Sequence, residues 1–418
     1  MRLPYIPARG GIDIIEEPNL ASPGSTFPRA KPPSITLESS ERSVIPNPSS
    51  SSAYLLLEDG KAFPGHSLGA PGTTLGEVVF NTSMTGYQEI LTDPSYAGQL
   101  VTMTYPLQGN YGVNREDRES QGPQVSGFVV REASRIFSSW RGEGTLDQYL
   151  SEHGVVGIQG VDTRALTRHI RSEGAMRAAI APNSASADSV MKLIQAHPRM
   201  EGLDLACGVS TPSRYEVAAV GRERFHVVAY DFGVKAHSPK LLSEKECRVT
   251  VVPAETSLAE ILEAEPDGLF VSNGPGDPAA VEKAQDAILS LSERGTPVFG
   301  ICLGHQLICR AFGARTYKLS FGHHGGNHPV RRLQGGAVEI TAQNHGFAVQ
   351  KDQGGAITDA PDLELTHVNL YDDTVEGVAH RNRPVFSVQY HPEAAPGPHD
   401  SRYLFDEFIA LMERAKGA

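Results

Sequence analysis

The stretch Gly300-Ile301-Cys302-Leu303-Gly304-His305-Gln306 decides the fold of the second half of this chain. The apolar run 297–299 before it is typical of a short buried strand, and residues 307–312 after it have the apolar spacing of a helix. Gly313 then occupies a helix C-cap position. A G-x-C-x-G pattern between a strand and a helix predicts a nucleophile elbow, a sharp turn that holds its central residue in a strained backbone conformation.

Cys302 is the central residue of this elbow and is therefore a candidate nucleophile. The turn is expected to lift the thiol to the carboxyl edge of a sheet. There, the N-terminus of the following helix favours the thiolate, which is the nucleophilic form. The alternative is a buried structural cysteine, the usual role of a lone cysteine. Because G-x-C-x-G is only moderately specific, further catalytic groups are needed to decide between the two.

The length and composition of the chain exclude several classes of protein. The chain has 418 residues, enough for about two or three domains, and 39% hydrophobic and 21% charged residues are ordinary values for a globular protein. Its net charge of −12 argues against a nucleic-acid partner. No apolar run approaches the ~20 residues that a transmembrane helix needs, so no membrane span is expected. The four cysteines form no C-x-x-C pair, which favours a reducing compartment, the cytoplasm, over a disulfide scaffold or a zinc site.

Local patterns divide the chain into consecutive segments. Residues 1–52 are rich in proline and serine, lack hydrophobic periodicity and are predicted to be a disordered or flexible extension. Residues 53–205 are predicted to be a strand-led α+β domain, residues 206–224 a polar linker, and residues 225–416 an α/β domain. The first domain is expected to hold strands within 54–61 and at 77–82, 99–105 and 127–130, and helices at 145–153, 161–173 and 186–196.

The α/β domain is predicted to be a doubly wound, mainly parallel sheet, because short apolar strands alternate with helices. The strands are expected at 225–231, 247–252, 268–272 and 297–299, and the helices at 239–246, 257–264, 281–294 and 401–416. Ligands of such sheets bind beyond the carboxyl ends of the strands. Those ends carry the elbow and the loop 273–278, so the functional site is expected there.

Residues 385–393 supply the catalytic partners that a cysteine nucleophile needs. Pro392 keeps His391 extended, and side chains two residues apart on an extended chain point to the same side. Glu393 is therefore predicted to hold one imidazole nitrogen of His391 and to leave the other for the thiol of Cys302, as in other triads. The alternative is a strand-end histidine beside a surface glutamate, which the presence of the elbow disfavours.

Acyl chemistry also needs an oxyanion hole. The elbow offers the backbone N–H of Leu303, the residue after the nucleophile. The loop 273–278 offers the N–H of Gly276, since Pro275 has none and the glycines of this loop permit close backbone approach. The alternative for this loop is a plain tight turn.

Together, residues 300–306, residues 273–278 and His391-Pro392-Glu393 resemble the class I glutamine amidotransferase domain. The first half of the chain narrows the resemblance to the small subunit of carbamoyl-phosphate synthase. The segments that carry it are residues 76–80, 81–96 and 162–164, joined by residues 229–233, 321–329, 343–347 and 396–400. The likeness extends over about residues 53–416, and the long motif is highly specific because other amidotransferases lack this first domain.

The resemblance implies a glutaminase that forms a γ-glutamyl thioester on Cys302, with His391 as base and then acid and Glu393 as its orienting group. The residues that it implies for binding L-glutamine are Ser95, Gly274, Gly276, Leu303, Gln306, Asn344, Gly346 and Phe347. Because Ser95 belongs to the first domain, the site is expected at the domain junction.

The resemblance also implies a partner, the large subunit of carbamoyl-phosphate synthase. Ammonia would pass through a tunnel to that subunit, which would use bicarbonate and two ATP, with Mg²⁺, to make carbamoyl phosphate. The product would serve arginine synthesis, pyrimidine synthesis or both, and the sequence does not distinguish them. This chain is expected to hold no cofactor of its own, and it has no G-x-x-x-x-G-K-[ST] phosphate loop.

Two features depart from the family pattern. After residues 231–235, the usual Asn-Ile is replaced by His237 and Ser238, which puts the local helix packing or a subunit contact in doubt. The second departure is the extension over residues 1–52.

Other functions fit this sequence less well than a glutaminase. The histidines of residues 321–328 suggest zinc, but no matching carboxylate or cysteine spacing accompanies them, and no metal is expected. A free-standing γ-glutamyl hydrolase on the same fold would need no partner, but it would leave residues 53–205 without a purpose. A regulatory subunit with a dead site would lack one of Cys302, His391 and Glu393, and all three are present.

Overall fold

The computed structural model of the chain describes residues 51–417. The extension predicted over residues 1–52 therefore lies outside the described residues, apart from its last two. Within residues 51–417, none of the helices has the length and apolar character needed to cross a bilayer.

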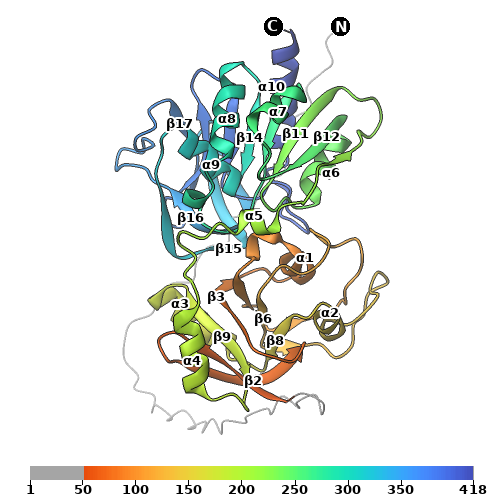
Figure 1. Cartoon of the computed structure of the whole chain (residues 1–418), viewed down its shortest axis with the longest axis vertical. Helices are drawn as coiled ribbons and strands as arrows, with labels where there is room; N and C mark the ends of the chain where they lie inside the picture. Colours follow the sequence, from red (N-terminus) through yellow and green to blue (C-terminus); the bar gives the residue numbers. More distant parts are fainter. Residues whose placement is uncertain (1–50, 418) are drawn as a thin grey trace, which may run out of the picture. The chain divides into compact units, whose positions relative to one another are not determined.

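The first domain is built on a closed barrel (Figure 1), whose strands follow the order β1-β2-β8-β6-β4-β3-β9 and return to β1. The strands are β1 (Ser52–Leu57), β2 (Ala62–Gly69), β3 (Thr74–Asn81), β4 (Gln99–Met103), β6 (Gly127–Val129), β8 (Val156–Gln159) and β9 (Met176–Pro182). Closure pairs β1 with both β2 and β9, so the barrel leaves no open edge. Apolar side chains such as Leu55, Val78 and Leu100 fill the interior.

Short helices connect and cover the barrel. They are α1 (Tyr87–Thr92), the 3-10 turn η1 (Pro94–Tyr96), α2 (Leu146–Glu152), α3 (Thr163–Glu173) and α4 (Ala187–Ala196), with a small separate sheet of β5 (Leu107–Gln108) and β7 (Glu132–Ala133). The strands and helices predicted for this domain are present. Sequence analysis missed β8, β9 and the two-residue strands β5 and β7. The run of alanines in β9 has low strand propensity.

The second domain contains a ten-stranded sheet in the order β10-β12-β11-β13-β14-β19-β18-β17-β15-β16. Its strands are β10 (Tyr215–Val217), β11 (Phe225–Asp231), β12 (Cys247–Pro253), β13 (Gly268–Val271), β14 (Val298–Ile301), β15 (Thr316–Arg332), β16 (Val338–Val349), β17 (Leu363–Asn369), β18 (Val375–His380) and β19 (Val385–Val388). Its helices are α5 (Ala206–Val209), α6 (His237–Glu244), α7 (Leu258–Glu263), η2 (Pro278–Ala280), α8 (Ala284–Glu293), α9 (Leu303–Ala311) and α10 (Tyr403–Gly417).

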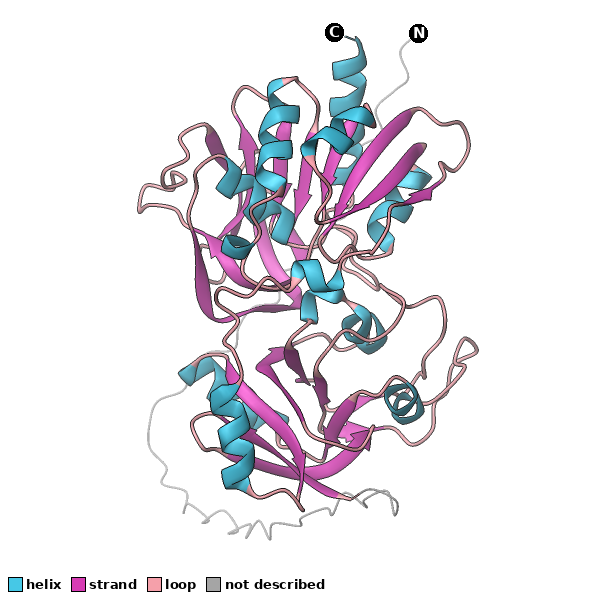
Figure 2. Cartoon of the chain, viewed as in Figure 1, coloured by secondary structure: helices cyan, strands magenta, loops and turns pink. Residues whose placement is uncertain are grey.

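Helices pack on both faces of the parallel strands, as Figure 2 shows. One apolar core joins the sheet to α6 and α10 through side chains such as Leu242 and Phe405. The other core joins it to α7, α8 and α9 through side chains such as Ile261, Ile288 and Leu307. The doubly wound α/β fold predicted for this domain is therefore confirmed.

Two details of that prediction were wrong. The sheet is mixed rather than mainly parallel: β12, β11, β13, β14 and β19 run parallel, while the strands from β18 to β16 are antiparallel. The predicted linker 206–224 is also not a plain linker, because it contains α5 and the edge strand β10, which pairs with β12. A strand this short carries too few alternating residues to stand out in the sequence.

Candidate active site

Cys302 occupies the turn between β14 and α9, at the carboxyl edge of the parallel strands. Its φ of 55° and ψ of −105° form a backbone conformation that residues other than glycine rarely adopt. The N–H of Cys302 donates to Val388 O of β19 at 2.9 Å. The neighbouring glycines are required by close packing: a Cβ on Gly304 would stand 2.0 Å from Val271 O, and one on Gly300 would collide with α9. The structure therefore contains the strained elbow that the sequence predicts.

His391 and Glu393 follow β19 and form a buried pair, with His391 Nδ1 at 2.7 Å from Glu393 Oε1. The His391 N–H donates to Ala342 O of β16 at 2.9 Å, which fixes the backbone at this point. Among the described residues His391 Nε2 has no hydrogen-bond partner, so this nitrogen is left for the thiol. The thiol of Cys302 donates to the main-chain oxygen of Asn344 at 3.4 Å. The structure thus brings the three predicted catalytic residues together.

The charges of this group favour an imidazolium beside a carboxylate. Burial opposes the charged imidazole, but Glu393 and Cys302 outweigh burial and raise the pKa of His391 to about 10, while Lys235 acts in the opposite direction. Burial also opposes the Glu393 carboxylate, but Lys235 and His391 lower its pKa to about 2. Both groups are therefore charged at neutral pH, so an imidazolium–carboxylate pair lies beside Cys302.

Cys302 lies at a narrow pocket that residues of both domains line. The predicted substrate-binding residues in its wall are Ser95, Gly274, Gly276, Gln306, Asn344, Gly346 and Phe347. Leu303, the remaining one, is the buried first residue of α9. The pocket has a volume of about 20 Å³, room for one water molecule, so surrounding groups must move to admit glutamine.

The first domain contributes Ser95 through the turn η1. Asp93 caps this turn, and its Oδ1 accepts the N–H of Ser95 at 2.9 Å. Ser95 Oγ accepts a hydrogen bond of 2.9 Å from Asn273 Nδ2, at the end of β13 in the second domain. Ser95 is therefore fixed from both domains, as its predicted place at the domain junction requires.

Comparison with known proteins decides the family. The family model described as carbamoyl-phosphate synthase small chain, CPSase domain, matches residues 55–180, and the model described as glutamine amidotransferase class-I matches residues 228–411. The carbamoyl phosphate synthase small chain of Chlorobaculum tepidum is 54% identical over 366 residues, covering 87% of this chain and 98% of the relative. Those of Synechococcus and Syntrophotalea carbinolica are 53% and 52% identical, covering 86% and 87% of this chain and 93% and 98% of each relative. The chain belongs to the carbamoyl phosphate synthase small-chain family.

The oxyanion hole of this small chain, formed by the N–H groups of Leu303 and Gly276, stays a prediction, and the positions of both residues are compatible with it. Leu303 begins α9, so its N–H is one of the groups that a helix N-terminus leaves unpaired within the helix. Gly276 lines the same pocket as Cys302 and has a φ of +89°. A Cβ at this position would stand 2.7 Å from Leu203 O, so the loop depends on a glycine here.

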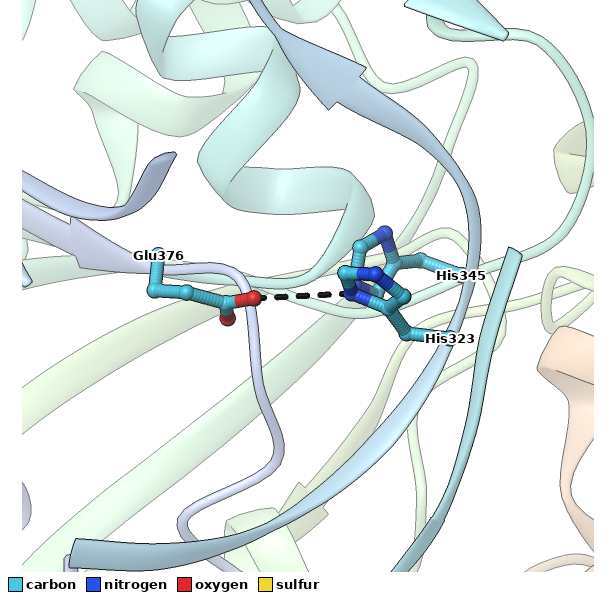
Figure 3. A group of neighbouring side chains, drawn as sticks. All are labelled: His323, His345 and Glu376. Carbon is cyan, nitrogen blue, oxygen red and sulfur yellow. Dashed lines mark ion pairs between the residues drawn. The ribbon is translucent and has the colours of Figure 1, made fainter. Parts of the chain in front are cut away.

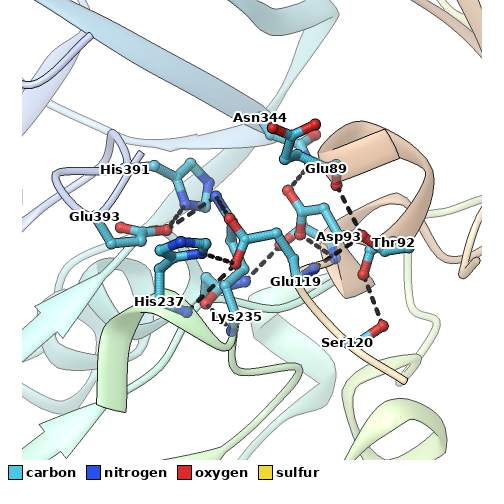
Figure 4. A network of polar contacts seen from close by, with 12 residues as sticks. Glu89, Thr92, Asp93, Glu119, Ser120, Lys235, His237, Asn344, His391 and Glu393 are labelled. Atoms are coloured by element: carbon cyan, nitrogen blue, oxygen red, sulfur yellow. Dashed lines mark hydrogen bonds and ion pairs between the residues drawn. The ribbon is translucent and has the colours of Figure 1, made fainter. Parts of the chain in front are cut away.

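Sequence reasoning missed the polar residues behind Glu393 (Figure 4). Lys235 Nζ lies 3.2 Å from Glu393 Oε1 and 3.6 Å from Glu119 Oε1. Lys235 belongs to the family-like run 231–235, so a signal for it existed. Glu119 lies in the loop between β5 and β6, and nothing in the neighbouring sequence marks it. Further pocket residues that were missed are Glu77, Gln99, Met200 and His345.

The two residues that depart from the small-chain pattern start α6. His237 turns toward the network, with Nδ1 at 3.0 Å from Glu119 Oε2. Ser238 is buried, and its Oγ has no hydrogen-bond partner among the described residues. The departure at His237 therefore lies at the contact between the two domains.

His323, His345 and Glu376 form a buried group whose atoms are close enough to hold a metal (Figure 3). Both nitrogens of His345 are occupied, Nδ1 by Phe347 O at 2.7 Å and Nε2 by Gln343 Oε1 at 3.0 Å. Burial lowers the pKa of His323, but Asp372 and Glu376 outweigh burial and raise it to about 9. His323 Nε2 lies 2.8 Å from Asp372 Oδ2 and His323 Nδ1 lies 3.6 Å from Glu376 Oε1, so both of its nitrogens face carboxylates in an ion-pair network.

Proposed function

We propose that this chain is the glutaminase subunit of a carbamoyl-phosphate synthase, which hydrolyses L-glutamine and delivers ammonia to a large subunit. The observation that carries the proposal is the Cys302 elbow with its buried His391–Glu393 pair, placed at a pocket that includes Ser95 of the first domain. A nucleophile, an acid–base group and an orienting carboxylate are the elements that acyl transfer needs.

The first half of the reaction forms the thioester. The Cys302 thiolate attacks the γ-carbonyl carbon of glutamine, and the N–H groups of Leu303 and Gly276 hold the oxyanion that develops. The His391 imidazolium gives its proton to the leaving nitrogen, so the C–N bond breaks and ammonia departs. His391 thus acts first as the base that takes the proton of the Cys302 thiol and then as the acid that releases it to the leaving nitrogen.

The second half hydrolyses the thioester. His391, now neutral, takes a proton from water while the water oxygen attacks the thioester carbonyl. The C–S bond breaks, glutamate leaves, and the Cys302 thiolate with its imidazolium is restored. Glu393 stabilises the imidazolium and holds the ring so that Nε2 stays on the side of the sulfur.

Glutamine is held by groups that the pocket already positions. Gln306 Nε2 donates to Phe347 O at 2.8 Å and to Gln389 Oε1 at 3.0 Å. This arrangement leaves the amide oxygen of Gln306 available to a donor such as the substrate α-amino group. Ser95 of the first domain and the main chain of Gly346 in the second domain supply further polar groups to the pocket.

A second cavity, of about 570 Å³ and lined in part by His391, offers a route for ammonia. His391 lines this cavity while Cys302 lines the narrow pocket, and Asn344 lines both. Met84, which is 67% exposed, also lines the cavity, so the cavity reaches the surface. We infer that ammonia released at Cys302 passes His391 and leaves through this cavity toward the large subunit.

The partner supplies the remaining chemistry of this proposal. The large subunit binds ATP and Mg²⁺ and converts bicarbonate and ammonia to carbamoyl phosphate, for arginine or pyrimidine synthesis, and this chain holds no cofactor. The proposal places the heterodimer in the cytoplasm, where reducing conditions keep the Cys302 thiol available.

The test is to measure glutamine hydrolysis and carbamoyl phosphate synthesis with the purified chain alone, and with the large subunit that co-purifies with it. Synthesis from glutamine only in the presence of both chains supports the proposal. Full-speed hydrolysis by the isolated chain, without a bound synthetase, would indicate a free-standing γ-glutamyl hydrolase.

A further inference from the structure

Glu119 is a first-domain carboxylate that is buried within the catalytic network of the second domain (Figure 4). Its Oε1 lies 3.6 Å from Lys235 Nζ and its Oε2 lies 3.0 Å from His237 Nδ1. Its main-chain oxygen accepts the N–H of Ala236 at 2.8 Å. Burying a carboxylate is costly unless cations and hydrogen bonds compensate, and here all of these partners come from the second domain.

Glu119 is also fixed from its own domain. Its N–H donates to Thr92 Oγ1 at 2.9 Å, and Ser120 Oγ donates to Thr92 O at 2.7 Å. Thr92 ends α1 and directly precedes Asp93, which caps the turn that carries Ser95. The Glu119 carboxylate therefore holds a fixed position relative to the first-domain wall of the pocket.

Lys235 connects Glu119 to the catalytic histidine. Glu393 Oε1 faces both His391 Nδ1, at 2.7 Å, and Lys235 Nζ, at 3.2 Å. One carboxylate oxygen thus serves two cations, and the ammonium lowers the pKa of His391. Glu119 is a second carboxylate beside Lys235, and its negative charge offsets part of the positive charge of the Lys235 ammonium. The repulsion between that ammonium and the His391 imidazolium is therefore weaker, and the attraction of His391 to Glu393 is less opposed.

We propose that Glu119 is a positioning residue for glutamine hydrolysis, which shares Lys235 with Glu393 and thereby keeps His391 in its imidazolium form beside Cys302. His237 holds the second oxygen of Glu119 in place. The inference rests on the proposed function and deepens it, because it makes the state of the catalytic histidine depend on a residue of the first domain.

The charged groups around this network determine the pH range of a test. The charged groups close to Lys235 or Glu119 are Glu393, His391, His237 of α6, and Glu89 and Asp93 of the first domain, and Cys302 lies beside His391. Burial, Asp117 and Glu119 raise the pKa of Glu89 to about 7. Above this pH Glu89 is ionised, so it does not obscure the loss of the His391 proton at higher pH.

The experiment measures glutamate release by the complex with the large subunit, as a function of pH, for wild type and Glu119→Gln. Removing the carboxylate leaves the Lys235 ammonium less compensated, which destabilises the imidazolium. The alkaline limb of kcat should therefore move to lower pH by about one unit, the lower end of the effect of a nearby charge. KM for glutamine should change by less than about twofold, since Glu119 does not line the glutamine pocket.

Matched variants separate charge from shape. Glu116→Gln removes an exposed carboxylate of the same loop and should leave the alkaline limb in place. Glu119→Asp keeps the charge but withdraws it from Lys235, so it should give a smaller shift in the same direction, and it serves if Glu119→Gln does not fold. In a Lys235→Gln background, Glu119→Gln should cause little further shift, because its effect passes through Lys235.

The inference would be overturned if a folded Glu119→Gln complex showed the same alkaline decline of kcat as wild type. If Glu119→Gln does not fold, an unchanged alkaline decline of kcat in Glu119→Asp would overturn it. A full shift that persists in the Lys235→Gln background would also overturn it. These results differ from failure of the proposed function, in which the wild-type complex itself would release no glutamate from glutamine.

Discussion

Asn344 and Asp93 join the two domains at the catalytic centre, with Asn344 Nδ2 donating to Asp93 Oδ2 at 3.0 Å. The main-chain oxygen of Asn344 accepts the thiol of Cys302 at 3.4 Å. Asp93 also caps the turn that carries Ser95. The nucleophile and the first-domain wall of the glutamine pocket therefore share a hydrogen-bonded partner, and displacement of one domain alters both.

Cys302→Ala should abolish carbamoyl phosphate synthesis from glutamine, while the complex still uses free ammonia. The reason is that the thiol serves only the release of ammonia, upstream of the large subunit. The two activities are measured side by side, with gel filtration to show that the complex is assembled. Loss of ammonia-dependent synthesis in an intact complex would contradict this division of labour.

His391→Asn should lower glutamine turnover by at least ~100-fold, the usual contribution of a positioned acid–base group. Glu393→Gln should cost less, because Glu393 orients the ring and stabilises its charge without transferring protons. Mass spectrometry of the Cys302 thioester during turnover is the second measurement. Normal formation and breakdown of the thioester in His391→Asn would refute the assignment of His391.

A glutamine-analogue alkylator should label Cys302 and spare Cys309. Cys309 lies inside α9 and is fully buried, and burial raises the pKa of its thiol. Cys302 lies at the pocket beside the His391 imidazolium. Peptide mapping after partial alkylation decides the matter, and equal labelling of both thiols would mean that the elbow does not control reactivity.

The ion pairs of His323 should make stability depend on pH. The pKa of His323 is raised from 6.5 to about 9, so its contribution is fully present below about pH 6.5 and is lost as pH rises toward about 9. The contribution amounts to about 3 kcal/mol at most. Urea unfolding across this range should show a smaller alkaline decline for His323→Gln than for wild type or the control His153→Gln. Equal declines would assign the pH dependence to other groups.

Much of the catalytic site could be predicted because its parts have local signatures. The elbow around Cys302 is defined by two glycines that the close approach of a strand and a helix requires. The pairing of His391 with Glu393 follows from the two-residue spacing on an extended chain. Such features depend on neighbours in the sequence, so a single sequence reveals them.

The parts that could not be predicted depend on contacts between distant segments. Glu119 acquires its place only when its loop meets Lys235 of the other domain. The antiparallel half of the sheet was not predicted from the sequence, because its strands are irregular. Register shifts between Lys318 and His323 and between Gly325 and His328 interrupt the alternation that would have indicated β15.

Ser95→Ala should chiefly raise KM for glutamine. Ser95 lines the pocket from the first domain, and because its Oγ accepts a hydrogen bond from Asn273, its hydroxyl hydrogen can donate to another group. A lost hydrogen bond to bound substrate weakens the ground state and the transition state alike. The loss should be about 0.5–1.5 kcal/mol, or more if the substrate group is charged.

The same variant tests how the domain junction is controlled. Interfaces between domains move by default unless they are large and apolar, and the glutamine pocket must open from about 20 Å³ to admit its substrate. We therefore expect the isolated chain to be a slow glutaminase that the large subunit accelerates markedly. Steady-state kinetics of wild type and Ser95→Ala, alone and with the large subunit, provide the measurement. An isolated chain at full speed, with Ser95→Ala indistinguishable from wild type, would point to a hydrolase that needs neither the first domain nor a partner.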